Sequence, residues 1–291
     1  NNDGTFAAAT STNLGTAPDS VAVGDFDHDS DLDVAVLKTS SDQVAVLPNN
    51  GDGTFASAVD YSVGDQPECV VVGDFNNDGY QDIAAANYID DSVSVLINNE
   101  DGTFGTAANY AVGDGPVSLT VGDIDGDGDL DLAIPNSTAN NATVLKNDGD
   151  GTFASAGDYA VGAGPRAAAI ADLDGDGNAD LVIGNASDDD VSVLRNNSIH
   201  RSFLLMSAVN YSAGTAPRAL AVGDFDRDGD ADLAACNQNS DNVSVLLNDG
   251  SGVYSSAVNY TVGNEPMGIL ADDLDNDGDL DLAVSNNADN N

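Results

Sequence analysis

Short apolar stretches alternate with polar turns along this 291-residue chain, and the same order returns about every 49 residues. In the third copy the apolar stretches cover residues 117–121, 132–134, 143–145 and 152–161. None of them has the 3.6-residue period of an amphipathic helix, and each is as short as an ordinary strand. We therefore expect four short antiparallel strands in each repeat.

The apolar pattern also indicates where each strand of a repeat lies. The third strand alternates, as in Val243-Ser244-Val245, which is typical of a half-exposed position. The first strand is apolar on both faces, as expected for a buried strand near an axis. Residues 167–169 are all Ala and favour a helix in isolation, but the register of the repeat predicts a strand there.

Four-stranded units of this length, repeated around an axis, are typical of a β-propeller. We predict an all-β fold and a single propeller domain over residues 1–291, with six four-stranded blades of about 49 residues. Small residues suit the crowded inner rim of such a ring, and one stands two positions after each turn proline: Ser20, Cys69, Ser118, Ala167, Ala219 and Gly268.

An Asp-rich loop with the consensus DxDxDGxxD follows the first strand of every repeat. The six copies begin at Asp25, Asp74, Asp123, Asp172, Asp224 and Asp273, with spacings of 49, 49, 49, 52 and 49 residues. Acidic or amide side chains at positions 1, 3, 5 and 9 of a tight turn can converge on one hard cation, and position 7 can add its carbonyl. The sequence therefore predicts up to six Ca²⁺ sites, one per repeat.

The candidate ligands are four side chains in each loop. They are Asp25, Asp27, Asp29 and Asp33; Asp74, Asn76, Asp78 and Asp82; Asp123, Asp125, Asp127 and Asp131; Asp172, Asp174, Asp176 and Asp180; Asp224, Asp226, Asp228 and Asp232; and Asp273, Asp275, Asp277 and Asp281. Asn76 removes one charge from the second loop, and Ser30 replaces the Gly that the sharp turn favours. We predict that the first and second sites are the weakest.

The Asp-rich loops have two alternative interpretations. An EF-hand needs a Glu at the twelfth loop position, where this chain has Val36, Ala85 and Ile134, so that motif is excluded. Asp-rich turns without metal are the other alternative, but six crowded sets of carboxylates repel each other unless they are neutralised.

The net charge of −43 supports the same interpretation, because 47 of the 50 acidic residues are Asp and 27 of these stand in the six loops. A surface this acidic is a poor partner for nucleic acid or an anionic membrane, and no apolar run approaches the length of a membrane span. Adaptation to high salt is a second explanation of the charge, helped by the presence of only two Lys, but it does not explain Asp at fixed spacing.

The pattern VxVGDFDxDGxxDLAVxN, followed by VSVLLNNGDGTF and by Y.VG..P, resembles the FG-GAP or VCBS repeat along essentially the whole chain. Such repeats build the calcium-binding propeller at the head of integrin α chains and of many secreted bacterial proteins. The resemblance implies the propeller fold, calcium between the first and second strands and ligand contacts on the opposite face. It does not identify a ligand. Because millimolar calcium outside cells could saturate modest sites and resting cytosolic calcium could not, we expect an extracellular or cell-surface location.

Partner contacts are expected on the face opposite the calcium loops, where Asn-, Asp- and Ser-rich loops gather over residues 87–92, 136–142, 185–190 and 237–242. Protein or glycan partners fit these loops, and plain solvated turns are the alternative. The fourth repeat differs, because Ile199, His200, Arg201, Leu204, Leu205 and Met206 are locally basic and apolar. This segment is either a docking patch or a repacked loop.

Catalysis is not expected. His28 and His200 are the two histidines, and no Ser/His/Asp or Cys/His order stands out. An accessory or catalytic propeller of a polysaccharide-active enzyme remains an alternative. Cys69 and Cys236 occupy repeats on opposite sides of a six-unit ring, so two small buried thiols are expected rather than a disulfide.

The strand count is one short of six complete blades. The chain begins with the fourth strand of a repeat and ends after the second strand of the sixth, so the last blade lacks its third strand. Either the chain is part of a longer propeller or another chain donates the strand, as in a self-assembling extracellular fibre or sheath subunit. We expect a secreted, calcium-stabilised propeller that serves as an adhesion or recognition module.

Overall fold

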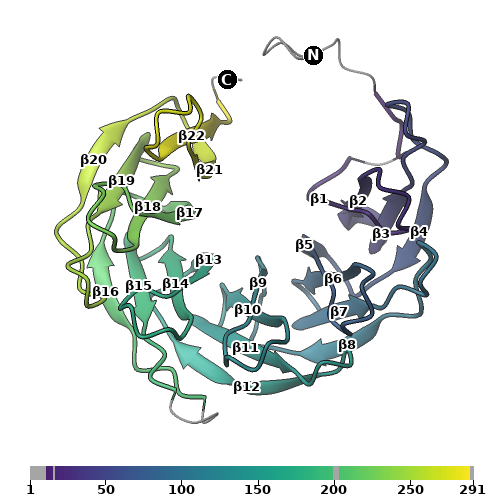
Figure 1. The fold of residues 1–291 in the computed structure, drawn as a ribbon, viewed down its shortest axis with the longest axis horizontal. Coiled ribbons are helices and arrows are strands. Elements are labelled where there is room, and N and C mark those ends of the chain that lie inside the picture. The colour runs from purple at the N-terminus through teal and green to yellow at the C-terminus, as the bar shows by residue number, and fades with distance from the viewer. Residues whose placement is uncertain (1–10, 16, 199–202, 289–291) are drawn as a thin grey trace.

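The computed structural model describes residues 11–15, 17–198 and 203–288, and these are almost entirely β. Five four-stranded antiparallel sheets and one two-stranded sheet stand around a central axis, as Figure 1 shows. In each complete blade the strands follow chain order from the axis outward. The prediction of propeller blades repeated about every 49 residues is confirmed.

The blades are numbered in chain order and consist of the following strands. The first has β1 (Val21–Gly24), β2 (Asp33–Lys38), β3 (Gln43–Leu47) and β4 (Val59–Ser62), and the second β5 (Pro67–Gly73), β6 (Asp82–Asn87), β7 (Ser92–Leu96) and β8 (Ala108–Ala111). The third has β9 (Thr120–Gly122), β10 (Asp131–Asn136), β11 (Asn141–Asn147) and β12 (Phe153–Ala160), and the fourth β13 (Pro165–Ala171), β14 (Asp180–Asn185), β15 (Asp190–Leu194) and β16 (Val209–Ser212). The fifth has β17 (Pro217–Gly223), β18 (Asp232–Asn237), β19 (Asn242–Leu246) and β20 (Val258–Thr261), and the sixth β21 (Pro266–Asp272) and β22 (Asp281–Asn286).

Two local expectations can be checked directly. The Ala run at 167–169 lies in β13, so tertiary pairing overrides its helix propensity. The inner strand of the third blade is shorter than the predicted 117–121. Its partner β10 contains Pro135, which has no N–H to donate to the facing Ser118, so the ladder begins only at Thr120.

The core lies between neighbouring blades. One cluster joins Phe26 and Val46 of the first blade to Ile83 and Leu96 of the second, and similar clusters recur around the ring. Apolar burial between sheets is the main favourable term in such a fold, at about 25 cal/mol per Å². Stability therefore depends on each blade having its neighbour.

Tyr residues that recur once per repeat pack between the blades. Phe104 of the second blade contacts both Phe26 and Tyr61 of the first edge to face, with centroid distances of 5.4 and 5.3 Å. Equivalent T-shaped pairs follow at Tyr110–Phe153, Tyr159–Phe203 and Tyr211–Tyr254. Such pairs contribute about 0.5–1.5 kcal/mol beyond the area they bury.

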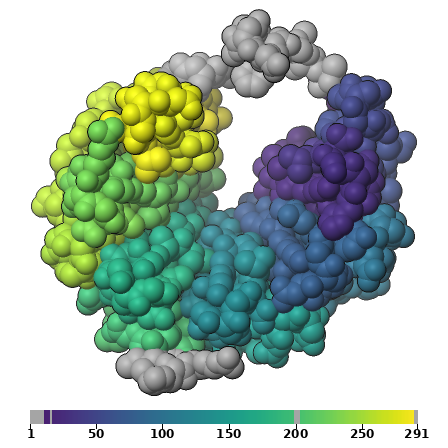
Figure 2. Space-filling view, in the orientation of Figure 1, coloured from purple at the N-terminus to yellow at the C-terminus, as the bar shows by residue number. Residues whose placement is uncertain are grey.

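The ring of described blades is open between β22 and the first blade, as Figure 2 shows between the yellow and purple residues. Tyr260, the Tyr of the fifth blade, is 57% exposed, because no aromatic residue of the described sixth blade packs on it. Cys69 and Cys236 are both free, and Cys69 is half-buried rather than fully buried as expected. Within the described ranges, no helix is long and apolar enough to cross a membrane.

Candidate metal centre

Each Asp-rich loop joins the innermost strand of a blade to the second strand, and its first carboxylate organises the turn. In the third loop, Asp123 Oδ1 accepts the N–H groups of Gly126 and Asp127 at 2.8 and 3.1 Å, and Oδ2 accepts that of Gly128 at 3.0 Å. Asp and Asn favour such local bonds to the backbone, which is why they form turns. The loop shape is therefore set by the same side chain that begins the motif.

Left-handed backbone occurs at the fourth and sixth positions of every loop. At the sixth position the described loops have Gly with φ between 87° and 99°, except for Ser30 with φ 77°. The N–H of Ser30 still donates to Asp25 Oδ2 at 3.1 Å, so the first loop keeps the common shape despite the substitution. A non-Gly residue in this conformation costs about 1–2 kcal/mol, which the first loop bears alone at this position.

In the first five loops the carboxylate at position 9 is buried and forms hydrogen bonds to backbone N–H groups. Asp131 Oδ2 accepts from the N–H of Ile124 at 2.9 Å, and Oδ1 accepts from that of Asn147 at 2.9 Å. Asp33, Asp82, Asp180 and Asp232 are held in the same way. Position 9 thus ties the loop to the end of the third strand, and each oxygen has a second lone pair for a cation.

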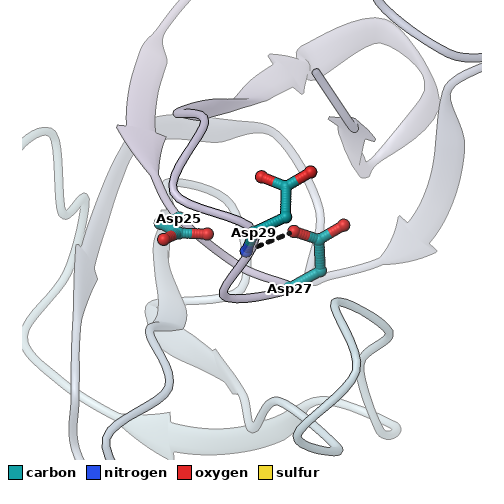
Figure 3. A group of neighbouring side chains, drawn as sticks. All are labelled: Asp25, Asp27 and Asp29. Carbon is teal, nitrogen blue, oxygen red and sulfur yellow. Dashed lines mark hydrogen bonds between the residues drawn. The ribbon is translucent and has the colours of Figure 1, made fainter. Parts of the chain in front are cut away.

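The structure brings three carboxylates together in five of the six loops, with one oxygen of each within 4.8 Å of the others. Asp25, Asp27 and Asp29 form the first group, shown in Figure 3, and Asp123, Asp125 and Asp127 form the third. The other three groups use position 9 in place of position 5, and they are Asp172, Asp174 and Asp180; Asp224, Asp226 and Asp232; and Asp273, Asp275 and Asp281.

Among the position-5 carboxylates, Asp29 and Asp127 belong to triads, whereas Asp78, Asp176, Asp228 and Asp277 do not. Asp29, Asp78, Asp127, Asp176, Asp228 and Asp277 at position 5 each accept the N–H two residues later. Asp33 and Asp131 are not in the triads of their own loops. The second loop has no triad of carboxylates, because Asn76 occupies position 3 and its amide donates to Asp78 Oδ2 at 2.7 Å. That bond uses an oxygen that a cation needs.

Besides Oδ1 of Asp279, which forms an ion pair with Arg227, three carboxylate oxygens in these loops are buried without any hydrogen-bond partner: Oδ1 of Asp25, Asp125 and Asp174. A buried anionic oxygen without a donor is costly, so such atoms call for a cation or another ligand. All three belong to the triads. The donor set of oxygen atoms fits a hard cation such as Ca²⁺ and does not resemble the N and S ligands of zinc.

Burial raises the pKa of the position-9 carboxyls in the first five loops. Desolvation raises the pKa of Asp82, Asp131 and Asp180 to about 6, although backbone hydrogen bonds oppose the shift on each. Nearby loop carboxylates raise these pKa values further through repulsion. The loops therefore carry concentrated negative charge at some cost to the folded state.

The third loop also has a cation of the protein's own. Lys146 forms an ion pair with Asp125, and its pKa is raised by that bond and by the charges of Asp131 and Asp127. The equivalent residue of the second repeat is Ile97. Sequence reasoning treated the third loop as complete and missed this competitor, which lies fifteen residues or more from the carboxylates along the chain.

An Asn sixteen residues after the position-9 Asp links neighbouring blades from the second blade to the fifth, and this was also missed. Asn98 Nδ2 donates to the carbonyl of Phe26 in the preceding loop at 2.8 Å, while its N–H donates to Asp82 Oδ1. Asp82 Oδ2 accepts from Phe75, whose carbonyl in turn accepts Asn147 Nδ2 at 2.7 Å. The same links recur at Asn196 and Asn248. A continuous chain of hydrogen bonds therefore connects the loops of successive blades.

Neighbouring loops also touch directly, from the fourth position of one to the seventh position of the next. His28 stacks on Tyr80 with centroids 4.1 Å apart, Asn77 Nδ2 donates to Asp129 Oδ1 at 2.7 Å, and Arg227 pairs with Asp279. The turn of the next blade packs against the loop as well. Gly102 has φ 77°, and a Cβ there would come within 2.9 Å of Asp27 Cβ, so only Gly fits.

At the opposite end of the fifth blade, neutral groups join the strands. Asn237 is fully buried, its Nδ2 donates to Asn242 Oδ1 and Ser244 Oγ at 2.8 and 2.9 Å, and Ser244 Oγ also accepts the N–H of Gly214. Asn136 and Asn185, which begin Asn-x-Ser/Thr sequons, are fully buried at equivalent positions and are not exposed to glycosylation in this fold. The turns beyond them, including Ile89 at 56% exposure, face solvent.

The irregular segment of the fourth repeat is described only in part. Ile199, His200 and Arg201 lie outside the described residues. Leu204 and Met206 are 53% and 42% exposed, whereas Leu205 is buried in the core beside Ile124. Leu205 thus occupies the place that Phe104 and Phe153 take in other blades, which supports repacking for that residue; the docking patch stays a prediction.

The model of the FG-GAP-like repeat matches five times, over residues 25–85, 74–134, 134–183, 172–235 and 224–284. No curated protein matches the chain by sequence.

Several solved structures share the fold at low sequence identity. A periplasmic gluconolactonase of Pseudomonas aeruginosa is 21% identical over 92% of this chain and 74% of that one, with a TM-score of 0.65. A lectin of Agrocybe aegerita that recognises non-reducing terminal N-acetylglucosamine is 22% identical over 91% and 73%, with a TM-score of 0.58. A protein of unknown function from Desulfotomaculum acetoxidans is 15% identical over 87% and 74%, with a TM-score of 0.64. At these identities the likeness concerns the propeller fold alone, whereas the family model covers most of the chain, and the chain therefore belongs to the FG-GAP-like repeat family.

Proposed function

We propose that this protein is a secreted, calcium-stabilised β-propeller that serves as an extracellular adhesion or recognition module, with calcium in a structural role. The observation that carries the calcium proposal is the set of buried, unpartnered oxygens on Asp25, Asp125 and Asp174, each inside a carboxylate triad. Ca²⁺ would be held by positions 1, 3, 5 and 9 of the loops, up to six ions in all. FG-GAP-like repeats and this donor set are compatible with that ion.

Calcium at these positions would reinforce the contacts between blades. Each loop carries the carbonyl that accepts the Asn of the next blade, so fixing the loop also fixes that acceptor. A ligand that binds only the folded state stabilises it by RT ln(1 + [L]/Kd), or about 2.7 kcal/mol per site at a hundredfold excess. Millimolar calcium outside cells would occupy even modest sites, which supports the proposed extracellular location.

Calorimetric titration of chelator-treated protein with CaCl2 tests the calcium proposal. We expect saturable heat at three or more sites and a rise of the unfolding midpoint that follows occupancy. The paired variant Asp224→Asn/Asp226→Asn should remove one site, whereas Asp249→Asn on an exposed turn should remove none. Absence of both heat and stabilisation would refute the proposal.

Recognition is proposed for the face that carries the second-to-third-strand turns. These turns are exposed and rich in Asn, Asp and Ser, and the loop face is occupied by the acidic clusters. A glycan array and a panel of extracellular matrix proteins, probed with the calcium-loaded chain, provide the test. Binding should be lost when the equivalent turn of each other blade is replaced by residues 237–242. Failure to bind any member of either panel counts against recognition on this face.

Strand donation between chains is a second candidate function, favoured by a groove beside the sixth blade. The groove has a volume of about 500 Å³ and is lined by Phe225, Val245, Tyr260 and Leu282, among others. In the complete interfaces the corresponding groove receives an aromatic side chain such as Phe104. A peptide of sequence SVSVLLNNGDGTF should therefore stabilise the chain, and sizing should show larger species as concentration rises. This function would be excluded if the protein is monomeric at every concentration and the peptide does not stabilise it. The expectation that the chain is not an enzyme stays a prediction.

A further inference from the structure

A polar cavity of about 360 Å³ lies on the axis of the ring, at the ends of the inner strands where the turn prolines stand. We call it the axial cavity. Its charged lining residues are Asp19 and Glu68 from the first and second blades and Arg166 and Arg218 from the fourth and fifth. The volume falls in the range of small-molecule sites, roughly 300–1,000 Å³. Two carboxylates therefore face the same space as two guanidinium groups.

All four charged residues occupy one position of the repeat, directly after the turn proline. Around the ring this position reads Asp19, Glu68, Val117, Arg166, Arg218 and Met267. In β5, β13, β17 and β21 the strand register skips this residue, which forms a β-bulge. Bulges redirect a side chain away from the regular pleat and are common next to binding sites. The fold thus presents this one position to the axis while its chemistry varies from blade to blade.

The turns before Arg166 and Arg218 are firmly held. Gly164 and Ala216 have left-handed φ values of 63° and 59°, and their N–H groups donate to Asn140 Oδ1 and Asp189 Oδ1 of the preceding blade at 2.9 and 3.0 Å. An Ala in this conformation is strained, and such strain persists only where the surrounding structure imposes it. The backbone of both arginines is therefore fixed before any ligand binds.

These two arginines are also the exceptions among the described cations. The others have partners: Lys38 with Asp60, Lys146 with Asp125, Arg227 with Asp279, and Arg195 with the carbonyl of Ser251. No hydrogen bond or ion pair within 4 Å joins Arg166 or Arg218 to any residue that the structure describes. In a chain with 50 acidic residues, two unpaired guanidinium groups in one cavity are unexpected.

Placing the two arginines together is unfavourable in the free protein. Burial lowers the pKa of Arg218, and the neighbouring charge of Arg166 lowers it further. An anion between them would relieve this repulsion and would receive the paired N–H groups that guanidinium offers to carboxylates. Glu68 and Asp19 on the other side would repel a second negative charge and attract hydrogen-bond donors.

We propose that the axial cavity binds a small carboxylate whose other end carries hydrogen-bond donors, with Arg166 and Arg218 holding the carboxylate and Glu68 and Asp19 receiving the donors. A sugar acid and an amino acid share this chemistry. The inference rests on the proposed recognition function for its biological meaning, since it names a ligand class. Its test is separate, because the cavity contains none of the loop carboxylates.

Calorimetric titration of the calcium-loaded full chain with D-galacturonate, D-galactose and L-glutamate tests the proposal. Galacturonate and galactose differ only at C6, where one has a carboxylate and the other a hydroxymethyl group. We expect saturable binding of galacturonate, glutamate or both, about tenfold or more tighter than galactose. Arg166→Gln and Arg218→Gln should each weaken it about tenfold, and the double variant should abolish it.

Arg227→Gln is the matched control, because Arg227 pairs with Asp279 on the loop face and should leave carboxylate binding unchanged. Arg218→Lys keeps the charge without the paired N–H geometry and should lose several-fold in affinity. An unchanged unfolding midpoint shows that each variant is folded. The proposal is overturned if neither carboxylate binds saturably, or if binding survives in the double variant, as it would if loop calcium held the carboxylate. If calcium binding still gives the expected heat in that case, the calcium proposal is unaffected.

Discussion

The two ends of the fifth blade are built from the same strands but hold together by different chemistry. At the loop end, buried Asp232 accepts two backbone N–H groups, and Asp224 and Asp226 crowd beside it. At the turn end, buried Asn237 and Ser244 join the strands through neutral hydrogen bonds. A neutral network needs nothing from outside, whereas carboxylates at this spacing repel each other until a cation arrives. Under the calcium proposal, the loop end of this blade should respond to external calcium and the turn end should not.

The largest effect is expected from Asp232→Ala at the loop end. This change removes the acceptor of the Phe225 and Asn248 N–H groups together with one candidate calcium ligand. Leaving two buried donors unsatisfied costs about 3–4 kcal/mol in the free energy of unfolding. Denaturant unfolding should show this loss in calcium and a smaller calcium-dependent stabilisation than in the parent. Asp249→Ala, an exposed turn residue, is the control, and equal losses in the two variants would contradict the assignment.

Ser244→Ala probes the turn end with a change of one oxygen. It leaves the N–H of Gly214 without its acceptor and removes one of the two acceptors of the Asn237 amide, for an expected loss of about 2 kcal/mol. Because no carboxylate cluster lies there, the loss should be the same with calcium and with chelator. A loss that changes by more than about 1 kcal/mol between the two conditions would show that the ends are coupled.

Lys146→Ile tests whether the third loop is weakened by its internal cation. Ile stands at the same position of the second repeat, so the substitution is compatible with the fold. Removing the ammonium from Asp125 should raise calcium affinity at this site about tenfold, equivalent to about 1.4 kcal/mol. Lys146→Gln should give a similar gain in the calorimetric titration. If neither variant changes any affinity, Lys146 does not compete with the metal.

The smallest effect is expected at the sixth position of the first loop. Ser30→Gly removes the backbone strain of a non-Gly residue in the left-handed conformation and should stabilise the protein by about 0.5–1 kcal/mol. Gly278→Ser in the sixth loop is the reverse change, where a side chain would meet no atom within 4 Å, and it should destabilise by a similar amount. Thermal unfolding of both variants measures the pair, and shifts of the same sign would rule out backbone strain as the cause.

Much of the fold can be predicted from the sequence, because the same local pattern recurs in every repeat. The turn chemistry, the strand order and the positions of the loop carboxylates depend on residues within one repeat. The inter-blade links could not be read in this way. Asn98 and Phe26 are 72 residues apart, and the contact depends on how two sheets pack. The available signal was the fixed spacing of sixteen residues between the position-9 Asp and the Asn that forms the link.

The two local surprises have similar causes. Lys146 reaches Asp125 from the third strand, and Leu205 fills the place of an aromatic residue after a changed turn. Both depend on side chains that cross from one element to another, and both depart from the repeat. Repeat symmetry therefore predicts the features that the blades share but not those that distinguish one blade from the next. The charges of the axial cavity differ from blade to blade, so repeat symmetry does not predict them.

Hydrogen–deuterium exchange with calcium and with chelator compares the two ends most directly, at a temperature where the chelated protein keeps its β-sheet circular dichroism. On removal of calcium, the amides of Phe225, Asp228 and Gly229 should lose protection at least tenfold, because loop carboxylates accept their N–H groups. The amides of Gly214 and Val262 at the turn end should change less than twofold. Equal change at both ends, or none at the loop end, would contradict calcium as the clamp of the Asp loops.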